Sequence, residues 1–184
     1  PTYHQKLKHV AAQRRALGVR TVFNVVGPLV NPAKPKYQII GTSDYTINDA
    51  VINVLKNKGV KKAMVVTSLD GIDEVTITDN TKVMELADNE IKSFEINPED
   101  YGLSKAKLAD IQVHSSEEAY LYGIEILNGK RGAGHDMVAL NAGTALYLTG
   151  IVRTIAEGVA MASKALLSGR SLLLLNKYAK FTHQ

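Results

Sequence analysis

The sequence contains no cysteine, and several common site motifs are also missing from its 184 residues. Without thiols the chain can form neither a disulfide framework nor a thiolate metal site. It has no Gly-x-x-x-x-Gly-Lys phosphate loop and no Gly-x-Ser-x-Gly nucleophile turn. Its five histidines do not have the spacing of metal ligands. A disulfide scaffold, a P-loop nucleotide site and a serine-hydrolase elbow are therefore excluded.

The sequence also lacks an apolar run that could span a membrane, since its longest candidate is Leu172–Leu175. Hydrophobic residues make up 45% of the chain and charged residues 22%, which is typical of a globular protein rather than a disordered one. The first residues do not have the pattern of a signal peptide. We therefore expect a cytoplasmic protein without a membrane partner, formed by one domain or by one domain and part of another.

Acidic residues are absent from the first 43 positions, which carry seven basic residues. The remainder has 15 basic and 18 acidic residues, so the net charge of +4 is unevenly distributed. A basic segment of this kind can face an anionic ligand or a nucleic acid. A solvated, lysine-rich helix explains the same charge, and both interpretations stay open at this point.

The hydrophobic pattern in the first half of the chain predicts a strand, a helix and a second strand. Residues 37–41 and 63–67 are short apolar runs typical of buried strands, and the helix between them ends at Gly59. Such a unit places its two strands parallel in one sheet. Residues 75–78 and 82–86 then predict an antiparallel hairpin with its turn at Asp79 and Asn80, and residues 90–96 predict a further strand.

The last third of the chain is expected to be helical with one strand. Two capping boxes, Ser115 with Glu118 and Thr154 with Glu157, each open a helix. The other expected elements are a buried strand over 137–141, a short helix over 142–148 and an outer segment over 171–178. Together the elements predict an α/β fold with a mixed, largely parallel sheet flanked by helices.

Two adjacent acids, Asp73 and Glu74, follow the apolar strand 63–67. In open α/β sheets, ligands bind in the crevice beyond the carboxyl ends of the strands. Two carboxylates there can hold a Mg²⁺ ion that carries a phosphorylated ligand, because Mg²⁺ prefers oxygen ligands and keeps few protein contacts. The simpler alternative is a pair of solvated acids in a surface loop.

Earlier in the chain, Arg14 is a candidate for binding a carboxylate. Its guanidinium can hold a small carboxylate with two hydrogen bonds, or else it is an exposed helix charge.

Residues 4–33 resemble the central signature of the anthranilate phosphoribosyltransferase family. The run that begins with Arg-x-x-Leu-Gly-x-Arg-Thr at Arg14 and ends at Pro32 is highly specific. The similarity extends over essentially the whole chain, through residues 70–74, 141–147, 157–158 and 168–169. The resemblance implies transfer of phosphoribosyl from phosphoribosyl pyrophosphate (PRPP) to anthranilate in tryptophan biosynthesis, with release of pyrophosphate. It also implies the two-domain fold shared with nucleoside phosphorylases.

The resemblance assigns roles to five residues and none to a general base. Arg14 matches the arginine that contacts the anthranilate carboxylate, and His4 and Pro28 match residues that line the anthranilate path. Asp73 and Glu74 match the acidic pair that holds Mg²⁺ near the pyrophosphate. Anthranilate and PRPP are therefore the expected small-molecule partners, a homodimer is the expected assembly, and nucleic acid is not an expected partner.

The family's glycine-rich pyrophosphate loop lies upstream of the first residue of this chain. The resemblance implies that residues 1–25 belong to a small helical domain and that residues 26–184 form the carboxy-terminal part of the α/β domain. We expect the 184-residue chain alone to be inactive, because its pyrophosphate site is incomplete. Two alternatives remain, a pyrimidine nucleoside phosphorylase-like enzyme and a non-enzymatic nucleic-acid-binding homologue.

Overall fold

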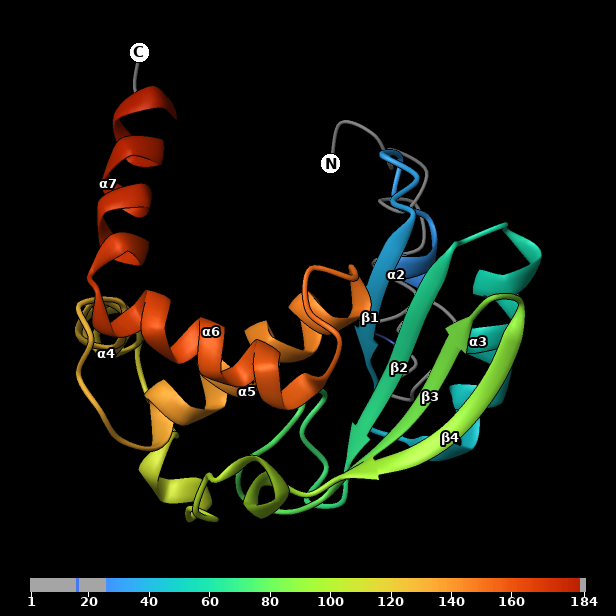
Figure 1. Ribbon diagram of the computed structural model, residues 1–184, viewed down its shortest axis with the longest axis horizontal. Helices are drawn as coiled ribbons and strands as arrows, with labels where there is room; N and C mark the ends of the chain where they lie inside the picture. Colours follow the sequence, from blue (N-terminus) through green and yellow to red (C-terminus); the bar gives the residue numbers. More distant parts are fainter. Residues whose placement is uncertain (1–15, 17–25, 183–184) are drawn as a thin grey trace.

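The computed structural model describes Ala16 and residues 26–182 of the chain (Figure 1). Within these residues, four strands form one sheet and helices lie on both of its faces. The strands are β1 (Tyr37–Gly41), β2 (Lys62–Ser68), β3 (Thr81–Ala87) and β4 (Glu90–Ile96). The helices are α2 (Val26–Leu29), α3 (Asn48–Asn57), α4 (Ser116–Leu127), α5 (Ala133–Leu148), α6 (Ile155–Leu167) and α7 (Arg170–Thr182), with short 3₁₀ turns at Tyr45–Ile47, Pro98–Tyr101 and Leu108–Asp110. The α/β fold predicted from the sequence is confirmed.

The strand–helix–strand unit predicted from the sequence is formed by β1, α3 and β2. The two strands are parallel, with Tyr37 opposite Lys62 and Gly41 opposite Val66. Strands β3 and β4 extend the sheet as antiparallel neighbours, in the order β1-β2-β3-β4. The described sheet is therefore mixed, as predicted, but it is not largely parallel, because β1–β2 is parallel whereas β2–β3 and β3–β4 are antiparallel.

The predicted hairpin over residues 75–86 is wrong. The observed hairpin joins β3 to β4, and its two-residue turn is Asp88-Asn89, with φ values of 50° and 63°. Positive φ at both central residues is the geometry of a type I′ turn, which asparagine and aspartate tolerate. Residues 75–80 are instead an irregular loop, because the hydroxyls of Thr76 and Thr78 bond within the loop and the backbone there does not join a ladder.

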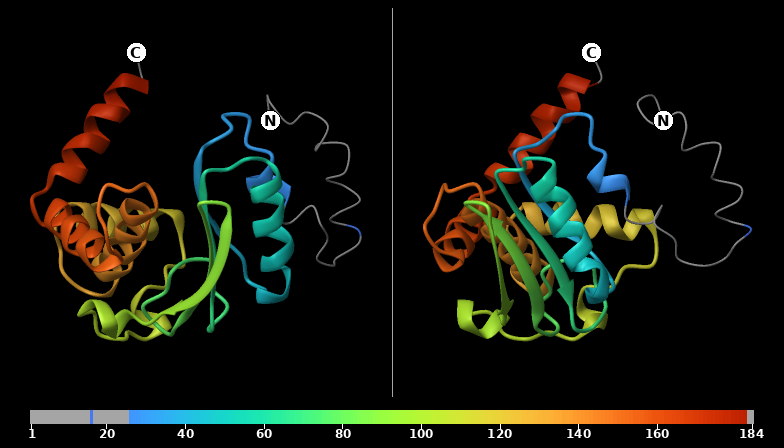
Figure 2. Two further views of the ribbon diagram at one scale, coloured as in Figure 1. Left: turned by 45° about the vertical axis from the view of Figure 1, so that its right-hand side comes forward. Right: turned by 90° about the vertical axis from the view of Figure 1, so that its right-hand side faces the viewer.

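Strand β2 is covered on both faces, so its core residues alternate between two apolar clusters. Ala63 and Val65 face α3, whereas Met64 and Val66 belong to the cluster that includes α5 and α6. Figure 2 shows α3 on one side of the sheet and α5 and α6 on the other. Strands buried on both faces have continuous apolar sequences, which is why residues 63–67 show no polar alternation.

The predicted strand over residues 137–141 is also wrong, because these residues lie in the middle of α5. The separate short helix expected over 142–148 is the second half of the same helix. A short apolar run fits a buried strand and a buried helix equally well, since periodicity does not separate the two. Helix α5 buries residues around most of its circumference, so it lacks the one-sided stripe that marks a surface helix.

The N-caps of both predicted capping boxes are confirmed, whereas the reciprocal bond of each glutamate goes to the residue before the cap. The Ser115 hydroxyl accepts a hydrogen bond from Glu118 N at 3.0 Å, and Thr154 accepts one from Glu157 N at 3.1 Å. Each glutamate also accepts a backbone N–H, from His114 at 2.7 Å and from Arg153 at 2.8 Å respectively. These bonds satisfy amide donors that have no partner within their helix.

Helices α5 and α6 cross at two glycines. A Cβ atom at Gly143 would lie 2.4 Å from Val159 N, and one at Gly158 would lie 2.2 Å from Gly143 O. Both distances are far below a van der Waals contact, and the neighbouring atoms belong to the backbone. The absence of side chains at these two positions therefore sets the separation of the helices.

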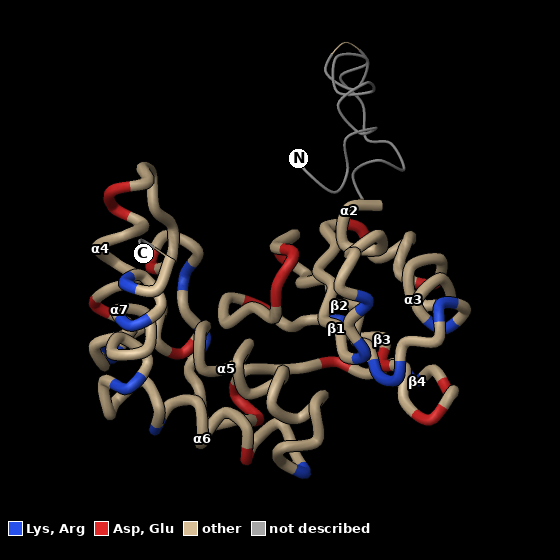
Figure 3. Tube along the Cα trace, turned by 90° about the horizontal axis from the view of Figure 1, so that it is seen from above, with Lys and Arg blue, Asp and Glu red and all other residues tan. Residues whose placement is uncertain are grey.

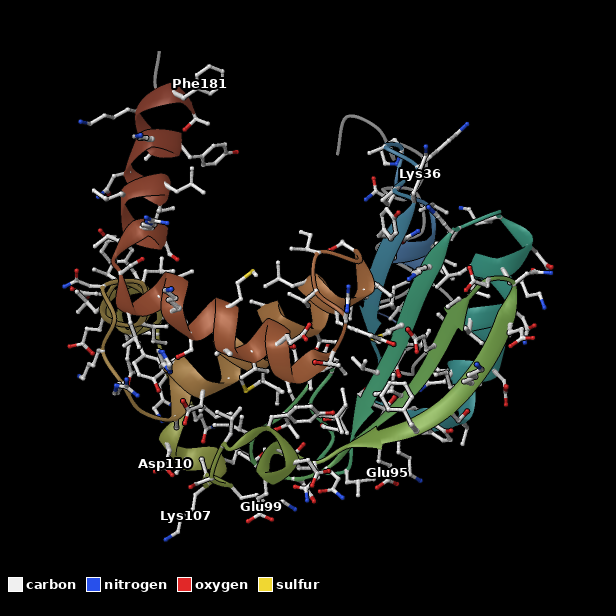
Figure 4. All side chains as sticks on the ribbon, in the orientation of Figure 1. Lys36, Glu95, Glu99, Lys107, Asp110 and Phe181 are labelled. Carbon is white, nitrogen blue, oxygen red and sulfur yellow. The ribbon has the colours of Figure 1, made fainter. Side chains whose placement is uncertain are left out.

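Helix α7 extends away from the sheet, as Figures 1 and 2 show. It presents four strongly exposed apolar side chains, Leu173, Leu174, Tyr178 and Phe181, and Figure 4 shows Phe181 at its outer end. Among residues 26–182, no single helix is long and apolar enough to cross a membrane. By length and composition alone, the pair α6 and α7 reaches that threshold across a bend of 68°.

The helix crossing gives a stability prediction. Gly143→Ala or Gly158→Ala should lower the free energy of unfolding by about 1–3 kcal/mol, because the new methyl group forces two backbones apart. The control is Gly123→Ala in α4, where no atom lies within 4 Å of the added Cβ. That variant should gain about 0.5–1 kcal/mol from helix propensity. Urea unfolding of the three variants measures the difference, and equal stabilities of the crossing and control variants would contradict the assignment.

Candidate functional site

The loop of residues 69–80 leaves the carboxyl end of β2 and carries Asp73 and Glu74. Both side chains are exposed. The backbone of Asp73 lies against the last residue of β1, since a Cβ atom at Gly41 would be only 1.5 Å from Asp73 O. The acidic pair therefore lies beyond the carboxyl ends of the two parallel strands, at the edge that the sequence predicts.

The start of this loop is organised by Asp70. Its Oδ1 accepts hydrogen bonds from the Ser68 hydroxyl at 2.5 Å and from Ile72 N at 3.4 Å. Its Oδ2 accepts from the hydroxyls of Thr76, at 3.3 Å, and Thr78. Gly71 has φ 86°, which closes the turn so that Ser68 N donates to Ile72 O at 3.2 Å.

These contacts lower the pKa of Asp70. Partial burial opposes ionisation, but the hydrogen bonds from Ser68, Thr78, Ile72 and Thr76 favour the carboxylate and outweigh it. Asp70 is therefore an ionised side chain that holds the loop together. Because its own oxygens accept these donors, it plays a structural part beside the exposed Asp73–Glu74 pair.

The end of the acidic segment is held by Asn141 of α5. Val75 N donates to Asn141 Oδ1 at 3.1 Å, and Asn141 Nδ2 donates to Val75 O at 2.7 Å. The same Nδ2 also donates to Met137 O, one turn earlier in the helix, at 2.9 Å. A single amide side chain thus binds both backbone groups of the residue that follows Glu74.

A buried polar cluster ties the carboxyl ends of β1 and β2 to α3. Thr42 donates its hydroxyl to Asn48 Oδ1 at 2.6 Å, and the Thr42 and Thr67 hydroxyls lie 2.5 Å apart. Asn48 Nδ2 also donates to Thr67 Oγ1 at 2.9 Å. Asn48 is completely buried, and both its side-chain oxygen and its side-chain nitrogen bond within this cluster. These bonds make the strand ends a rigid base beneath the loop.

The two carboxylates fit a magnesium ion of one particular kind. Among residues 26–182, no group of three or more His, Cys, Asp or Glu side chains could form a metal cage. A closed structural site is therefore not formed by the described chain. Mg²⁺ keeps several waters and commonly binds one or two carboxylates together with substrate phosphates. Asp73 and Glu74 suit an ion that arrives with a phosphorylated ligand.

Of the other three residues singled out in the sequence, Pro28 alone lies in the part of the chain that the structure describes. Arg14 and His4 lie outside the described residues. Pro28 is exposed in α2, which lies toward the amino-terminal end of β1 in Figures 1 and 2. Its part in an anthranilate path stays a prediction.

Three residues that shape the site are not predicted from the sequence: Gly41, Asp70 and Asn141. Asp70 and Asn141 stand in segments that carry the family resemblance, so their positions were marked but their contacts were not foreseen. Gly41 had no signal beyond ending an apolar run. All three act through contacts between distant segments, which periodicity along the chain does not contain.

The chain matches a family model described as the glycosyl transferase family, a/b domain, over residues 1–172. The chain belongs to this family. It is 39% identical over 183 residues to the anthranilate phosphoribosyltransferase of Acetivibrio thermocellus, which covers all of this chain and 53% of that protein. It thus spans about half the length of its curated relatives.

Solved structures agree with this membership. The crystal structure of anthranilate phosphoribosyltransferase from Thermus thermophilus is 34% identical, with a TM-score of 0.91 over 98% of this chain and 54% of that one. The Saccharomyces cerevisiae enzyme has been solved with 4-fluoroanthranilate and with PRPP and Mg. Each of these two structures is 26% identical in sequence to this chain, and their TM-scores are 0.83 and 0.82. Each match covers 94% of this chain and about half of the yeast chain.

Gly41→Ala should displace the acidic segment, because the new methyl group would occupy the position of Asp73 O. We expect this substitution to lower the free energy of unfolding by about 1–3 kcal/mol and to shift the loop away from β1. Thermal unfolding measures the first effect, and a crystal structure of the variant measures the second. Gly123→Ala is again the matched control. An unshifted loop in a Gly41→Ala variant of wild-type stability would contradict the close approach.

The Asp70 network predicts a pH dependence with a defined sign. A carboxyl whose pKa is lowered by folding stabilises the protein fully above its ordinary pKa of 3.8, and that contribution is lost as pH falls through the lower pKa of the folded state. Asp70→Asn should therefore be less stable than wild type at neutral pH, and the difference should shrink in acid. Urea unfolding between pH 7 and the acid limit of folding checks this. A difference that stays constant down to that limit would contradict the assignment.

Proposed function

We propose that the protein containing this chain transfers phosphoribosyl from PRPP to anthranilate, in tryptophan biosynthesis. The observation that carries the proposal is the position of Asp73 and Glu74, exposed and anchored beyond the carboxyl ends of β1 and β2. Support comes from the relatives named for this activity and from the yeast structure in complex with PRPP and Mg. The yeast complex with 4-fluoroanthranilate supports the second substrate.

In this reaction the anthranilate amine forms a bond to the anomeric carbon of PRPP, the bond from that carbon to pyrophosphate breaks, and the amine nitrogen loses one proton. Asp73 and Glu74 would hold Mg²⁺, which when bound neutralises charge on the leaving pyrophosphate. The part of this chain would be to constrain the backbone of the acidic loop before the ligand arrives, through the close approach at Gly41 and the hydrogen bonds of Asp70. Arg14 would hold the anthranilate carboxylate, and His4 and Pro28 would line its path. No general base is assigned.

The 184-residue chain contains only part of the expected pyrophosphate site. A pyrophosphate needs several backbone N–H donors as well as a metal, usually from a glycine-rich loop. The sequence has no such loop, so we propose that the 184-residue chain alone is inactive. Correct orientation of two substrates can lower the activation free energy by on the order of 7–11 kcal/mol, and an incomplete site loses much of that effect. We further propose that residues 1–25 belong to a helical domain and residues 26–184 to the α/β domain.

We also propose a homodimer. The exposed apolar side chains of α7 favour association. Figure 3 shows Lys and Arg along α7, which contacts the acidic helix α4 of the same chain, so the support for association is the exposed apolar side chains of α7. Light scattering would measure the mass, and a monomer would contradict the proposed homodimer.

A cytoplasmic location is proposed with the activity, because a multiply charged substrate such as PRPP does not cross a bilayer unaided.

The activity is tested in the full-length protein by the fluorescence of phosphoribosyl anthranilate. Asp73→Asn should lower Mg²⁺-dependent turnover at least about tenfold, as expected when a ligand or its support is removed, and should change the unfolding midpoint little. The control is Asp88→Asn, the same chemical change in the β3–β4 turn at the other end of the sheet, and it should leave turnover intact.

Three outcomes would contradict the proposal. Wild-type metal dependence in Asp73→Asn would remove the metal assignment. Phosphorolysis of pyrimidine nucleosides, without phosphoribosyl transfer, would favour the phosphorylase alternative. Salt-dependent DNA binding without turnover would favour a nucleic-acid-binding homologue.

A further inference from the structure

Asn141 lies on α5 but makes two of its hydrogen bonds to another part of the chain, the backbone of Val75. The geometry is reciprocal, because the side-chain oxygen accepts from Val75 N and the side-chain nitrogen donates to Val75 O. An amide is the side chain that provides both functions on one short stem. The two residues are 66 positions apart, so the contact joins the helical layer to the loop beyond the sheet.

Val75 needs these bonds. Its side chain is completely buried in the apolar cluster beneath the helices. A buried backbone N–H or C=O without a partner is costly, and residues 75–80 form no strand that could supply one. Asn141 therefore satisfies the backbone at the point where the chain passes from the exposed acidic pair into the core.

The position of Asn141 is itself fixed. Its Nδ2 donates to Met137 O in the preceding turn, which holds the side-chain rotamer. Two residues further along α5, Gly143 packs against Gly158 of α6 at backbone distance, which holds the helix. The amide is therefore presented to Val75 from a rigid support rather than from a mobile side chain.

The acidic pair lies between two such fixed points. On one side the backbone of Asp73 lies against Gly41 at the end of β1. On the other side Val75, the residue after Glu74, is held by Asn141. With both flanks fixed, the main-chain path of residues 73–74 is constrained, and with it the directions of the two Cα–Cβ bonds from which the carboxylates extend.

We propose that Asn141 is a positioning residue for the Asp73–Glu74 metal pair, acting through the backbone of Val75 without itself touching the metal. This inference rests on the proposed function, because it presupposes that the pair binds a divalent cation. It assigns a role to Asn141, the first residue of the segment 141–147. Substitution of Asn141 should weaken metal binding without removing any metal ligand.

The test uses Mn²⁺ as the probe, with its free concentration followed by electron paramagnetic resonance. Asn141→Leu keeps the size of the side chain and removes all three hydrogen bonds. Asn141→Thr is the milder variant, because its hydroxyl can donate to Met137 O, as Thr144 does to Leu140 O at 2.8 Å in the same helix. Both variants should bind Mn²⁺ about tenfold more weakly than wild type, the lower end of the effect of outer-shell substitutions.

The matched control is Thr144→Val, which removes a buried hydroxyl one turn away on α5 whose bond stays inside the helix. It should bind Mn²⁺ as wild type does. Amide hydrogen exchange provides a second readout, since Val75 N–H should exchange faster in both Asn141 variants and at the wild-type rate in the control. If one Asn141 variant does not fold, the other still gives both readouts.

Wild-type Mn²⁺ affinity in a folded Asn141 variant would overturn the positioning role, whatever the exchange data show. A further variant, Asp73→Asn, separates this failure from a failure of the proposed function. If Asp73→Asn also binds Mn²⁺ as wild type does, the acidic pair is not the metal site and both proposals fall. If Asp73→Asn alone binds weakly, the metal pair stands and only the role of Asn141 is lost.

Discussion

The backbones of α5 and α6 approach so closely at Gly143 and Gly158 that neither residue has room for a side chain. This contact fixes α5 against its neighbour, and α5 in turn packs on the face of the sheet formed by Met64 and Val66. Asn141, two residues before the crossing, is thereby held at a fixed height above the loop that follows β2. The backbone of Val75 is bound from that position, so the geometry of the acidic pair depends on how two helices pack.

The site is thus exposed but not loose. Asp73 and Glu74 are open to solvent, yet the backbone on each side of them is constrained by Gly41, Asp70 and Asn141. Adjacent carboxylates repel each other, and water screens that repulsion at an exposed position. Preorganisation of this kind would let a cation bind without first ordering the loop, because the loop is already ordered when the protein folds.

How far the sequence predicts this structure depends on the range of the interactions involved. The strand–helix–strand unit and the helix starts at Ser115 and Thr154 follow from local patterns, and they were predicted correctly. The hairpin was misplaced because Asp-Asn occurs twice, and the pair at residues 88–89 forms the turn. At residues 79–80, the surrounding threonine hydroxyls bond inside the loop instead of allowing strand pairing.

The site was predictable in part. The place of Asp73 and Glu74 follows from their position after an apolar strand, since parallel strands bring their carboxyl ends to one edge. The supports were not predictable, because Gly41 and Asn141 act on residues 32 and 66 positions away. The contact of Asn141 was also not predictable because a strand was expected over 137–141. Side chains leave a strand in other directions than they leave the observed helix.

Binding of a divalent cation at Asp73 and Glu74 is tested most directly by the paramagnetic broadening of backbone amide signals that substoichiometric Mn²⁺ causes. The amide signals of residues 69–76 and of Gly41 and Thr42 should broaden first, since these segments lie together at the edge of the sheet. Broadening centred instead on another exposed acidic pair, such as Glu117 and Glu118 of α4, would contradict it.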